Sequence, residues 1–464
     1  MKTAKSKINT SCKEITEINT LLVNQIPVSV DSANLFRNIP SFDVSPDKSS
    51  IPLRTPEIAV YAGSGVSHSW LWFVEILDRM EFSNVTFLDE NDVSSGKLKN
   101  IDSLLVSGGE TFAIANGLGI KGKKEIIDLL NRGGLYFGAC AGACMMLKST
   151  SSDLGLLDLV PARIANIVDE LPVPVKPSKK YSSPYGCAWV FHPVRGEVLL
   201  KLNSKNGNKN FRSISAPLFG GPPMEVDEST YSVAKYNAFT NSTDYLSTPA
   251  VAEEVLLGKT AILMKKYDKG TIVLSGPHLE HPDYPDANKM IAELIFQHIP
   301  DKPKVSNCHS EKADHFNSGL LKSLKREISN IRIVSFSLER TPVDWKIGRK
   351  YYEPEKIGVY VKTIWDRLND LEKKLRSAKD NLYNIKDLEK SIVHAEFATK
   401  QIRELKNKVN NKEPSDDLAA MLFYNLRKLS ICFYNFYFKN KQSNLTDIQK
   451  KIALSRKTVW HHQT

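Results

Sequence analysis

The sequence predicts an α/β fold with a mostly parallel sheet over residues 54–300, followed by an α-helical region over residues 356–464. Two patterns support this prediction. Between residues 57 and 150, short apolar runs alternate with amphipathic segments, which is typical of βαβ units. Between residues 359 and 413, glycine and proline are absent and apolar residues recur three or four positions apart, which is typical of long helices.

The first half of the α/β region supplies the expected parallel strands. Their ranges, read from the apolar runs, are 58–61, 85–88, 103–107 and 135–137. Helices are expected between them and after the last one, at 69–80, 123–131 and 143–148. A Gly-x-Gly sequence follows the strand at 58–61 and a glycine pair follows the strand at 103–107, and both indicate tight turns.

The second half of the same region is predicted to be more antiparallel. Strands are expected at 197–200, 231–234, 260–264 and 271–274. The last two flank the turn sequence Tyr-Asp-Lys-Gly and therefore predict a hairpin. A helix over 286–298 is expected to close the domain.

The C-terminal region is expected to contain two helices. Within 359–413, the apolar spacing from Ile364 to Val409 predicts one helix of about 70 Å with a heptad seam, and hence a coiled coil or hairpin. Pro414 ends it, and an aromatic-rich helix over 416–438 is expected to fold back on it. Residues 1–53, rich in Ser, Asn and Lys, are expected to form a mobile arm, and residues 301–355 a linker.

The net charge also differs between the two predicted regions of the chain. The formal net charge is +11, but residues 301–464 hold 33 Lys and Arg against 20 Asp and Glu, so the front is nearly neutral. This asymmetry suggests that the basic helical tail meets a protein partner, associates with itself, or contacts nucleic acid or an anionic membrane. No nucleic-acid signature accompanies the charge, and a solvated helical face explains it equally well.

The six cysteines lack the spacings of a zinc site or a disulfide framework. No stretch of about 18 uncharged apolar residues and no secretory signal is visible, so we expect a cytoplasmic protein with reduced thiols. No metal and no cofactor are expected. A cysteine in this setting is either a small buried residue or a nucleophile, and its neighbours decide which.

Cys140 has the neighbours that a nucleophile needs. It follows the strand at 135–137, and Gly138 and Gly142 stand two positions before and after it. A nucleophile at a strand-to-helix corner has a strained backbone and tolerates almost no side chains at those positions. A helix starting after Cys140 is expected to direct its positive end at the sulfur. Tight packing alone would also explain the small residues.

His278 and Glu280 are the predicted partners of Cys140. They stand two positions apart just past the last strand of the hairpin, where extended geometry places both side chains on one side. The imidazole is expected to act as general base and the carboxylate to orient it. The adjacent His281 is expected to face the other way. The backbone N–H groups of Gly109 and Ala141 are the expected oxyanion donors.

With these residues in order, the sequence resembles the class I glutamine amidotransferase-like proteins, which have a flavodoxin-like fold, a G-x-C-x-G elbow and a H-x-E pair after a late hairpin. It is most similar to the N-terminal domain family of biotin-protein ligases. The resemblance implies a Cys-His-Glu triad that attacks an amide carbonyl of a small-molecule substrate. The glycines expected to line the substrate site are Gly63, Gly65, Gly108 and Gly221.

Two features limit what the resemblance implies. Leu279 replaces the proline that many relatives have between the histidine and the glutamate. No Gly-Arg-Gly-Arg-Arg-Gly-like loop follows, and the C-terminal third is helical, so biotin ligation is not expected. No synthase domain that would use ammonia is visible either, so a glutaminase activity rests on the resemblance alone.

Two other functions fit parts of the sequence. The loop at 63–68 imitates the start of a dinucleotide fingerprint, with Asp89 and Glu90 after the second strand, but its third glycine is missing. Alternatively, the α/β domain is a catalytically silent binding module, and the protein acts as a scaffold through its basic helical region.

Overall fold

The computed structural model describes residues 2–23, 28–30, 51–150, 154–171, 181–203, 212–299, 314–315, 318–375 and 381–460. The chain forms two compact units, and each is described by itself. Unit 1 comprises residues 1–82 and 88–301, and unit 2 comprises residues 83–87 and 302–464. Residues 1, 24–27 and 31–50 of the predicted arm, and residues 300–313 and 316–317, lie outside the described residues.

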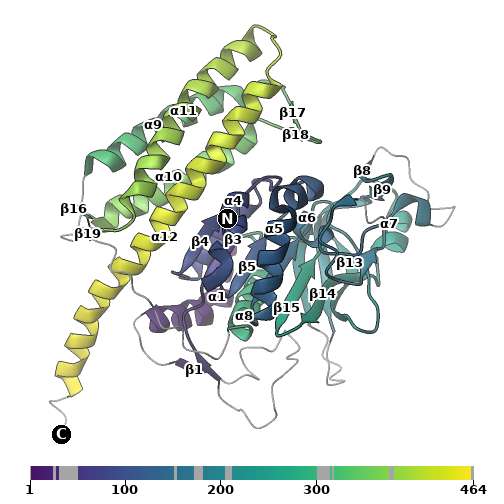
Figure 1. The fold of residues 1–464 in the computed structure, drawn as a ribbon, viewed down its shortest axis with the longest axis horizontal. Helices are drawn as coiled ribbons and strands as arrows, with labels where there is room; N and C mark the ends of the chain where they lie inside the picture. The colour runs from purple at the N-terminus through teal and green to yellow at the C-terminus, as the bar shows by residue number, and fades with distance from the viewer. Residues whose placement is uncertain are drawn as a thin grey trace. The chain divides into compact units, whose positions relative to one another are not determined.

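The core of unit 1 is one mixed sheet. Its strands follow the order β11-β10-β13-β14-β15-β6-β5-β3-β4 (Figure 1). From β15 to β3 the pairs are parallel, and from β11 to β15 they are antiparallel. The strands on the parallel side are β3 (Ile58–Tyr61), β4 (Val85–Leu88), β5 (Ser103–Val106), β6 (Leu135–Ala139) and β15 (Gly270–Ser275). The predicted α/β fold with a mostly parallel central sheet is therefore confirmed.

The antiparallel side extends this sheet by longer strands. They are β14 (Thr260–Tyr267), β13 (Tyr231–Tyr245), β10 (Val194–Leu202) and β11 (Ser213–Leu218). Two-residue strands β12 (Met224–Glu225) and β7 (Arg163–Ile164) attach beside β14. Smaller pairs join β1 (Val28–Val30) with β2 (Ile51–Leu53) and β8 (Ser182–Tyr185) with β9 (Ala188–Phe191). The predicted hairpin is β14–β15, and its turn residue Asp268 has φ 48°.

Helices connect the parallel strands and cover the sheet (Figure 1). They are α3 (Trp70–Arg79), α4 (Glu90–Ser94), α5 (Thr111–Asn131), α6 (Ala141–Cys144), α7 (Pro249–Leu256) and α8 (Pro285–Gln297). The central parallel strands β3 and β5 are buried at every position, as strands covered on both faces must be. Helix α5 begins twelve residues before the predicted position 123, and Gly119 interrupts it with φ 56° and ψ −164°.

Helix α1 (Lys2–Val23) lies in the range expected to be an arm. It packs on α8 of the same unit, and Cys12, Ile15 and Ile18 are buried. Asn19 donates a hydrogen bond of 2.9 Å to the carbonyl of Met80. Part of the N-terminal region thus contributes to the unit 1 core.

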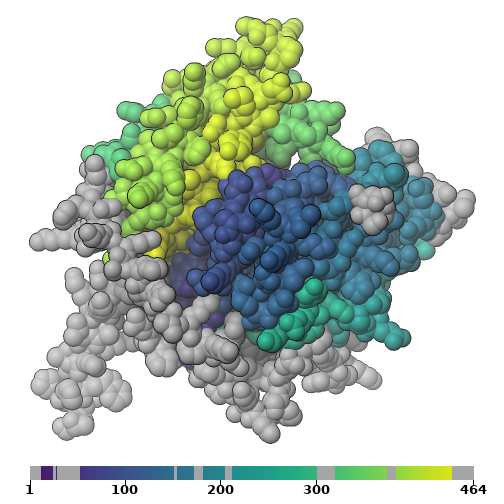
Figure 2. Space-filling view, viewed as in Figure 1, coloured from purple at the N-terminus to yellow at the C-terminus, as the bar shows by residue number. Residues whose placement is uncertain are grey.

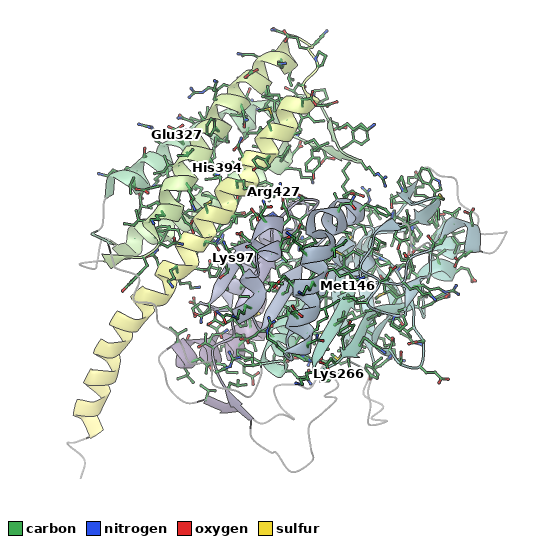
Figure 3. The ribbon with its side chains drawn as sticks, in the orientation of Figure 1. Lys97, Met146, Lys266, Glu327, His394 and Arg427 are labelled. Carbon is green, nitrogen blue, oxygen red and sulfur yellow. The ribbon has the colours of Figure 1, made fainter. Side chains whose placement is uncertain are left out.

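Unit 2 is built from four long helices. They are α9 (Ser318–Leu338), α10 (Glu355–Leu375), α11 (Ile385–Asn410) and α12 (Asp416–Trp460). Helix α11 packs against α9 and α12, and α10 packs against the same two helices, so the four surround one apolar core. Figure 2 shows the outer surfaces of α11 and α12 side by side. In Figure 3, the labelled Glu327, His394 and Arg427 come from α9, α11 and α12.

Two features of unit 2 differ from the sequence prediction. The single helix predicted over 359–413 is wrong: α10 and α11 are separate, and β19 (Asn381–Leu382) lies between them, paired with β16 (Asp314–His315). Helix α9 and the hairpin of β17 (Trp345–Ile347) and β18 (Lys350–Tyr352) occupy the range expected to be a linker. The predicted fold-back at Pro414 is present within the bundle, between α11 and α12.

No helix in the described parts of the chain is long and apolar enough to cross a membrane.

Candidate active site

Cys140 occupies a strained corner between β6 and α6. Its φ of 52° and ψ of −111° are unusual for a residue with a side chain, and its N–H donates to Ser275 O of the neighbouring strand β15 at 2.8 Å. A Cβ added at Gly138 would collide with the backbone of Gly142, and one at Gly142 would lie within 3.0 Å of the Val106 backbone. Both elbow glycines are therefore required by close backbone packing, as the sequence predicts.

The helix after the elbow is shorter than expected. Helix α6 comprises four residues, whereas the sequence indicated a helix over 143–148. A single turn has only a small dipole, so the expected attraction between a helix end and the sulfur contributes little. The Ala141 N–H is the first of its helix, so it has no acceptor within the helix.

His278 lies beside Cys140 and is held on both sides. It hydrogen-bonds the Cys140 thiol, and its Nδ1 lies 2.8 Å from Oε1 of Glu280. Both side chains of the pair are almost completely buried. Burial works to lower the pKa of His278, but the charge of Glu280 and the bonds to Cys140 and Glu280 outweigh it and raise the pKa to about 10. The imidazolium is thus the favoured form.

The loop that carries His278 is a turn and not the extended segment expected. Strand β15 ends at Ser275, and the His281 N–H donates to His278 O at 3.2 Å. The His278 N–H in turn donates to Pro217 O of β11 at 2.8 Å. The two predicted partners still meet, because the turn brings the i and i+2 side chains together. Burial lowers the pKa of His281, and Cys140 is not among the groups that act on it.

Ser107 is a part of the site that the sequence analysis missed. This fully buried residue at the end of β5 donates to Oε1 of Glu280 at 2.6 Å, the same oxygen that faces His278. Its hydroxyl lies 2.8 Å from that of Ser69, which lies 2.8 Å from that of Ser67. The second oxygen of Glu280 has no hydrogen-bond partner among the described residues. A motif search could not find Ser107, because three separate elements bring these hydroxyls together.

The predicted glycines divide into two groups. A Cβ at Gly108 would lie 2.6 Å from Cε1 of His278 and 3.4 Å from Cβ of Cys140, so Gly108 belongs to the cluster. The loops at 65–67 and 108–110 pair through backbone hydrogen bonds and hold Gly65 against Gly109. Gly221 packs on the carbonyl of Gly276, two residues before His278.

Gly63 faces Tyr61 and Glu90 instead. The Glu90 carboxylate accepts hydrogen bonds from the N–H and the hydroxyl of Ser64, both at 2.8 Å. A phosphate would need those donors, and a carboxylate already occupies them. The Asp89 carboxylate caps helix α4 by accepting hydrogen bonds from the N–H groups of Asn91 and Asp92. The dinucleotide interpretation has no support from this geometry.

Aromatic rings surround His278 on its open side, and the sequence analysis did not single them out. The ring of Trp72, from α3, stands edge-on to His278 at 5.2 Å between centroids and lies 4.6 Å from His281. Phe219, just after β11, lies 5.9 Å from His278 and 6.1 Å from Trp72. Groups of His, Cys, Asp and Glu that could hold a metal are absent from the described residues.

The geometry defines a class of protein: an α/β protein in which a partly exposed cysteine at a strained elbow lies beside a buried His-Glu pair. Residues 56–331 match the family model described as "Biotin-protein ligase, N terminal". The chain belongs to this family. A search of curated proteins finds no match.

Several solved structures resemble the chain at low identity. A glutamine amidotransferase is 15% identical over 52% of this chain and 98% of its own, with a TM-score of 0.34. The β-galactosidase from Bacillus circulans sp. alkalophilus is 12% identical over 52% of this chain and 31% of its own, with a TM-score of 0.32. The exo-β-1,4-mannosidase Op5Man5 from Opitutaceae bacterium strain TAV5 is 10% identical over 54% of this chain and 37% of its own, with a TM-score of 0.27. None of these similarities bears on activity.

Proposed function

We propose that unit 1 is a cysteine-dependent amide hydrolase or amidotransferase with Cys140 as nucleophile, His278 as general base and acid, and Glu280 as the group that orients the imidazole. One observation carries the proposal: His278 bonds Cys140 on one side and Glu280 on the other, in a buried position. A histidine with a purely structural role rarely bonds both a thiol and a carboxylate, whereas a histidine in nucleophilic catalysis needs both.

The reaction follows from the positions of the groups. Because His278 is favoured as the imidazolium, the proton of the Cys140 thiol already lies on His278, and the Cys140 sulfur attacks the carbonyl carbon of the amide as the thiolate to form a C–S bond. The C–N bond breaks, and the leaving nitrogen takes the proton from the imidazolium. Water then attacks the thioester with His278 as base, which releases the acid and restores the thiol. The Ala141 and Gly109 N–H groups are the proposed donors to the oxyanion.

Alkylation rates test this proposal. The full-length protein is treated with iodoacetamide at neutral pH, and the modification of each cysteine is followed by mass spectrometry. Cys140 is expected to react faster than the exposed Cys187 and the buried Cys144. His278→Asn is expected to slow Cys140 alkylation about 10²- to 10⁴-fold, the usual contribution of a general base. His394→Asn, in α11 of unit 2, is the matched control and should leave the rate unchanged.

Turnover distinguishes a working triad from a reactive thiol. The protein is incubated with simple primary and secondary amides in the presence of hydroxylamine, which attacks the Cys140 thioester and releases the acyl group as a hydroxamate. Cys140→Ala should abolish hydroxamate formation. Hydroxamate that still forms with this variant, or a Cys140 that reacts no faster than Cys187, contradicts the proposal.

A second function is supported by an observation in unit 2. A groove of about 710 Å³ lies between α9 and α10, and its lining includes Arg332, Ile333, Phe336 and Trp365. Ile333 and Phe336 are 70% and 59% exposed, and the Arg332 guanidinium stacks on Trp365 at 4.4 Å. Exposed apolar side chains beside cations suit an acidic amphipathic segment of a partner protein.

Peptide binding tests the second function. A helical peptide with an acidic face and an apolar face should bind the full chain, and Arg332→Glu should weaken that binding. A charge-reversed peptide of equal apolar content is the control. Equal binding of both peptides contradicts a groove that recognises acidic partners.

A further inference from the structure

The rings beside His278 form an aromatic wall, which we define as Trp72, Phe219 and His281. Trp72 and Phe219 both face the imidazole of His278, and His281 lies 4.6 Å from Trp72 and 6.4 Å from Phe219. Trp72 and His281 are partly buried, whereas Phe219 is 45% exposed. The wall therefore extends from the buried imidazole to an exposed ring.

Phe219 is not needed to hold His278 in place. Glu280, Cys140, Trp72 and the backbone of Pro217 already hold the imidazole and its peptide group. An aromatic ring that stays nearly half exposed leaves apolar surface in water, which folding alone does not favour. Because this exposed ring lies 5.9 Å from the ring of His278, it is available to cover a ligand.

The backbone fixes Phe219 relative to the loop of His278. Gly220 has φ 97°, and a Cβ at Gly221 would overlap the carbonyl of Gly276. The loop after β11 and the loop after β15 are thus packed backbone to backbone. Because His278 also bonds Pro217, Phe219 and His278 are positioned by one rigid assembly. A rigid aromatic surface of this kind is typical of a specificity determinant.

The charges around the wall do not suit a free amino acid. The charged groups that act on His278 and His281 are Glu280, Asp283, the Cys140 sulfur and His278 itself, and the one cation among them, His278, is already paired with Glu280. A free glutamine carries an α-carboxylate that requires a cationic partner at its binding site. The imidazolium of His278 contacts both rings and would repel a cationic group placed on them. A neutral planar group is what remains favourable.

On this basis, and resting on the proposed function, we infer that the amide substrate carries an apolar aromatic group next to its scissile carbonyl, and that Phe219 and Trp72 bind this group. An offset or edge-to-face ring pair contributes an increase of about 3- to 10-fold in binding. The wall is therefore the specificity-determining surface of the site.

Matched electrophiles test this inference. The full-length protein is treated separately with 2-chloroacetamide, N-benzyl-2-chloroacetamide, its trimethylammonioethyl analogue, and a glutamine-shaped chloroketone that keeps both charges of the free amino acid. In each case the Cys140 sulfur displaces chloride. The rate at Cys140 is divided by the rate at exposed Cys187 in the same sample, which removes the intrinsic reactivity of each reagent.

The ratio of the rate at Cys140 to the rate at Cys187 is expected to be about 10-fold higher for the benzyl reagent than for 2-chloroacetamide, because its ring contacts two aromatic side chains. Phe219→Ala should reduce this preference about 3-fold or more. Tyr245→Ala, which removes a similarly exposed ring (41%) elsewhere in unit 1, is the control and should not change it. Thermal unfolding verifies that each variant is folded.

The outcomes separate the two proposals. If Cys140 reacts rapidly with all four reagents but without an aromatic preference, or if Phe219→Ala leaves the preference intact, the inference is wrong and the proposed function stands. A preference for the glutamine-shaped or the cationic reagent also overturns the inference. If Cys140 is slower than Cys187 with every reagent, the proposed function itself fails.

Discussion

At the scale of single residues, His278 and His281 lie three positions apart in opposite electrostatic surroundings. For His278 the carboxylate of Glu280 and the bond to Cys140 outweigh burial, and its pKa rises from 6.5 to about 10. For His281 burial is the largest effect, and its pKa falls below 6.5. The two rings are thus expected to carry different charges at neutral pH.

A titration followed by NMR checks this expectation. The ring of His278 should stay protonated up to about pH 10, whereas that of His281 should lose its proton below pH 6.5. His278→Asn and His281→Asn assign the signals. Because the folded pKa of His278 is raised, its contribution to stability is fully present below pH 6.5 and lost as the pH rises toward 10. Two rings that titrate together near 6.5 would contradict the site geometry.

Glu280→Gln adds a sharper test. It removes the charge that raises the pKa of His278, and burial then dominates. The His278 signal should move to a lower pH by more than one unit, and His281 should hardly move.

The residues of the candidate site could be predicted from the sequence only where they are local. The Gly-x-Cys-x-Gly elbow and the His-x-Glu pair are short patterns, so Cys140, His278 and Glu280 were identified. Ser107, Trp72 and Phe219 come from three other elements, and only the folded sheet brings them to His278. Polar and aromatic residues of this kind are too common in sequences to be recognised without their neighbours.

At the scale of elements, the break between α10 and α11 is the clearest departure from the sequence pattern. Apolar spacing of three and four continues across the break, and no glycine or proline marks it. The local signal is instead Asn384, which adopts the left-handed conformation with φ 60° and ψ 42° before α11. Asparagine tolerates this conformation better than most residues. The spacing of apolar residues contains no information about such a polar residue, so it could not predict the break.

Substitution of this residue tests the break. Asn384→Val should destabilise unit 2 by about 1–2 kcal/mol, because a β-branched side chain is strained at positive φ. Lys386→Val, a β-branched change inside α11 at an exposed position, should cost only about 0.5 kcal/mol. Chemical denaturation of both variants measures the difference. If α10 and α11 were one continuous helix, the two substitutions would lower the free energy of unfolding by the same amount.

Helix α5 was shortened in the prediction for a related reason. Its first half contains Gly117, Gly119 and Gly122, which lower helix propensity. Packing overrides that propensity: a Cβ at Gly117 would touch Ser64, and one at Gly122 would meet Leu118. The central strands, by contrast, were predicted within about one residue of their ends, because strands buried on both faces give continuous apolar runs.

At the scale of the whole molecule, the chain has two separate cores. Leu104 of β5 is buried in unit 1, and Leu426 of α12 is buried in unit 2. The change in composition near residue 300 indicated this division, but it could not indicate that four helices enclose the second core. Which helices pack against each other depends on the loops that connect them, and the sequences of these loops have no recognisable pattern.

Calorimetry of the full chain tests whether the cores are independent. Two transitions are expected, because each unit buries its own apolar core. Leu426→Ala should destabilise only the unit 2 transition, by about 2–5 kcal/mol. Leu104→Ala is the converse control and should lower the other one. A single transition that shifts as a whole in both variants would contradict independent unfolding.

The corner at Cys140 has a consequence for how this gene product tolerates change. A residue other than glycine at φ 52° and ψ −111° stores about 1–3 kcal/mol of strain, so Cys140→Gly should unfold at higher denaturant than Cys140→Ala. The backbone of this corner thus favours glycine, and any side chain placed there lowers the stability of unit 1. Equal stability of the two variants would show that the corner stores no such strain.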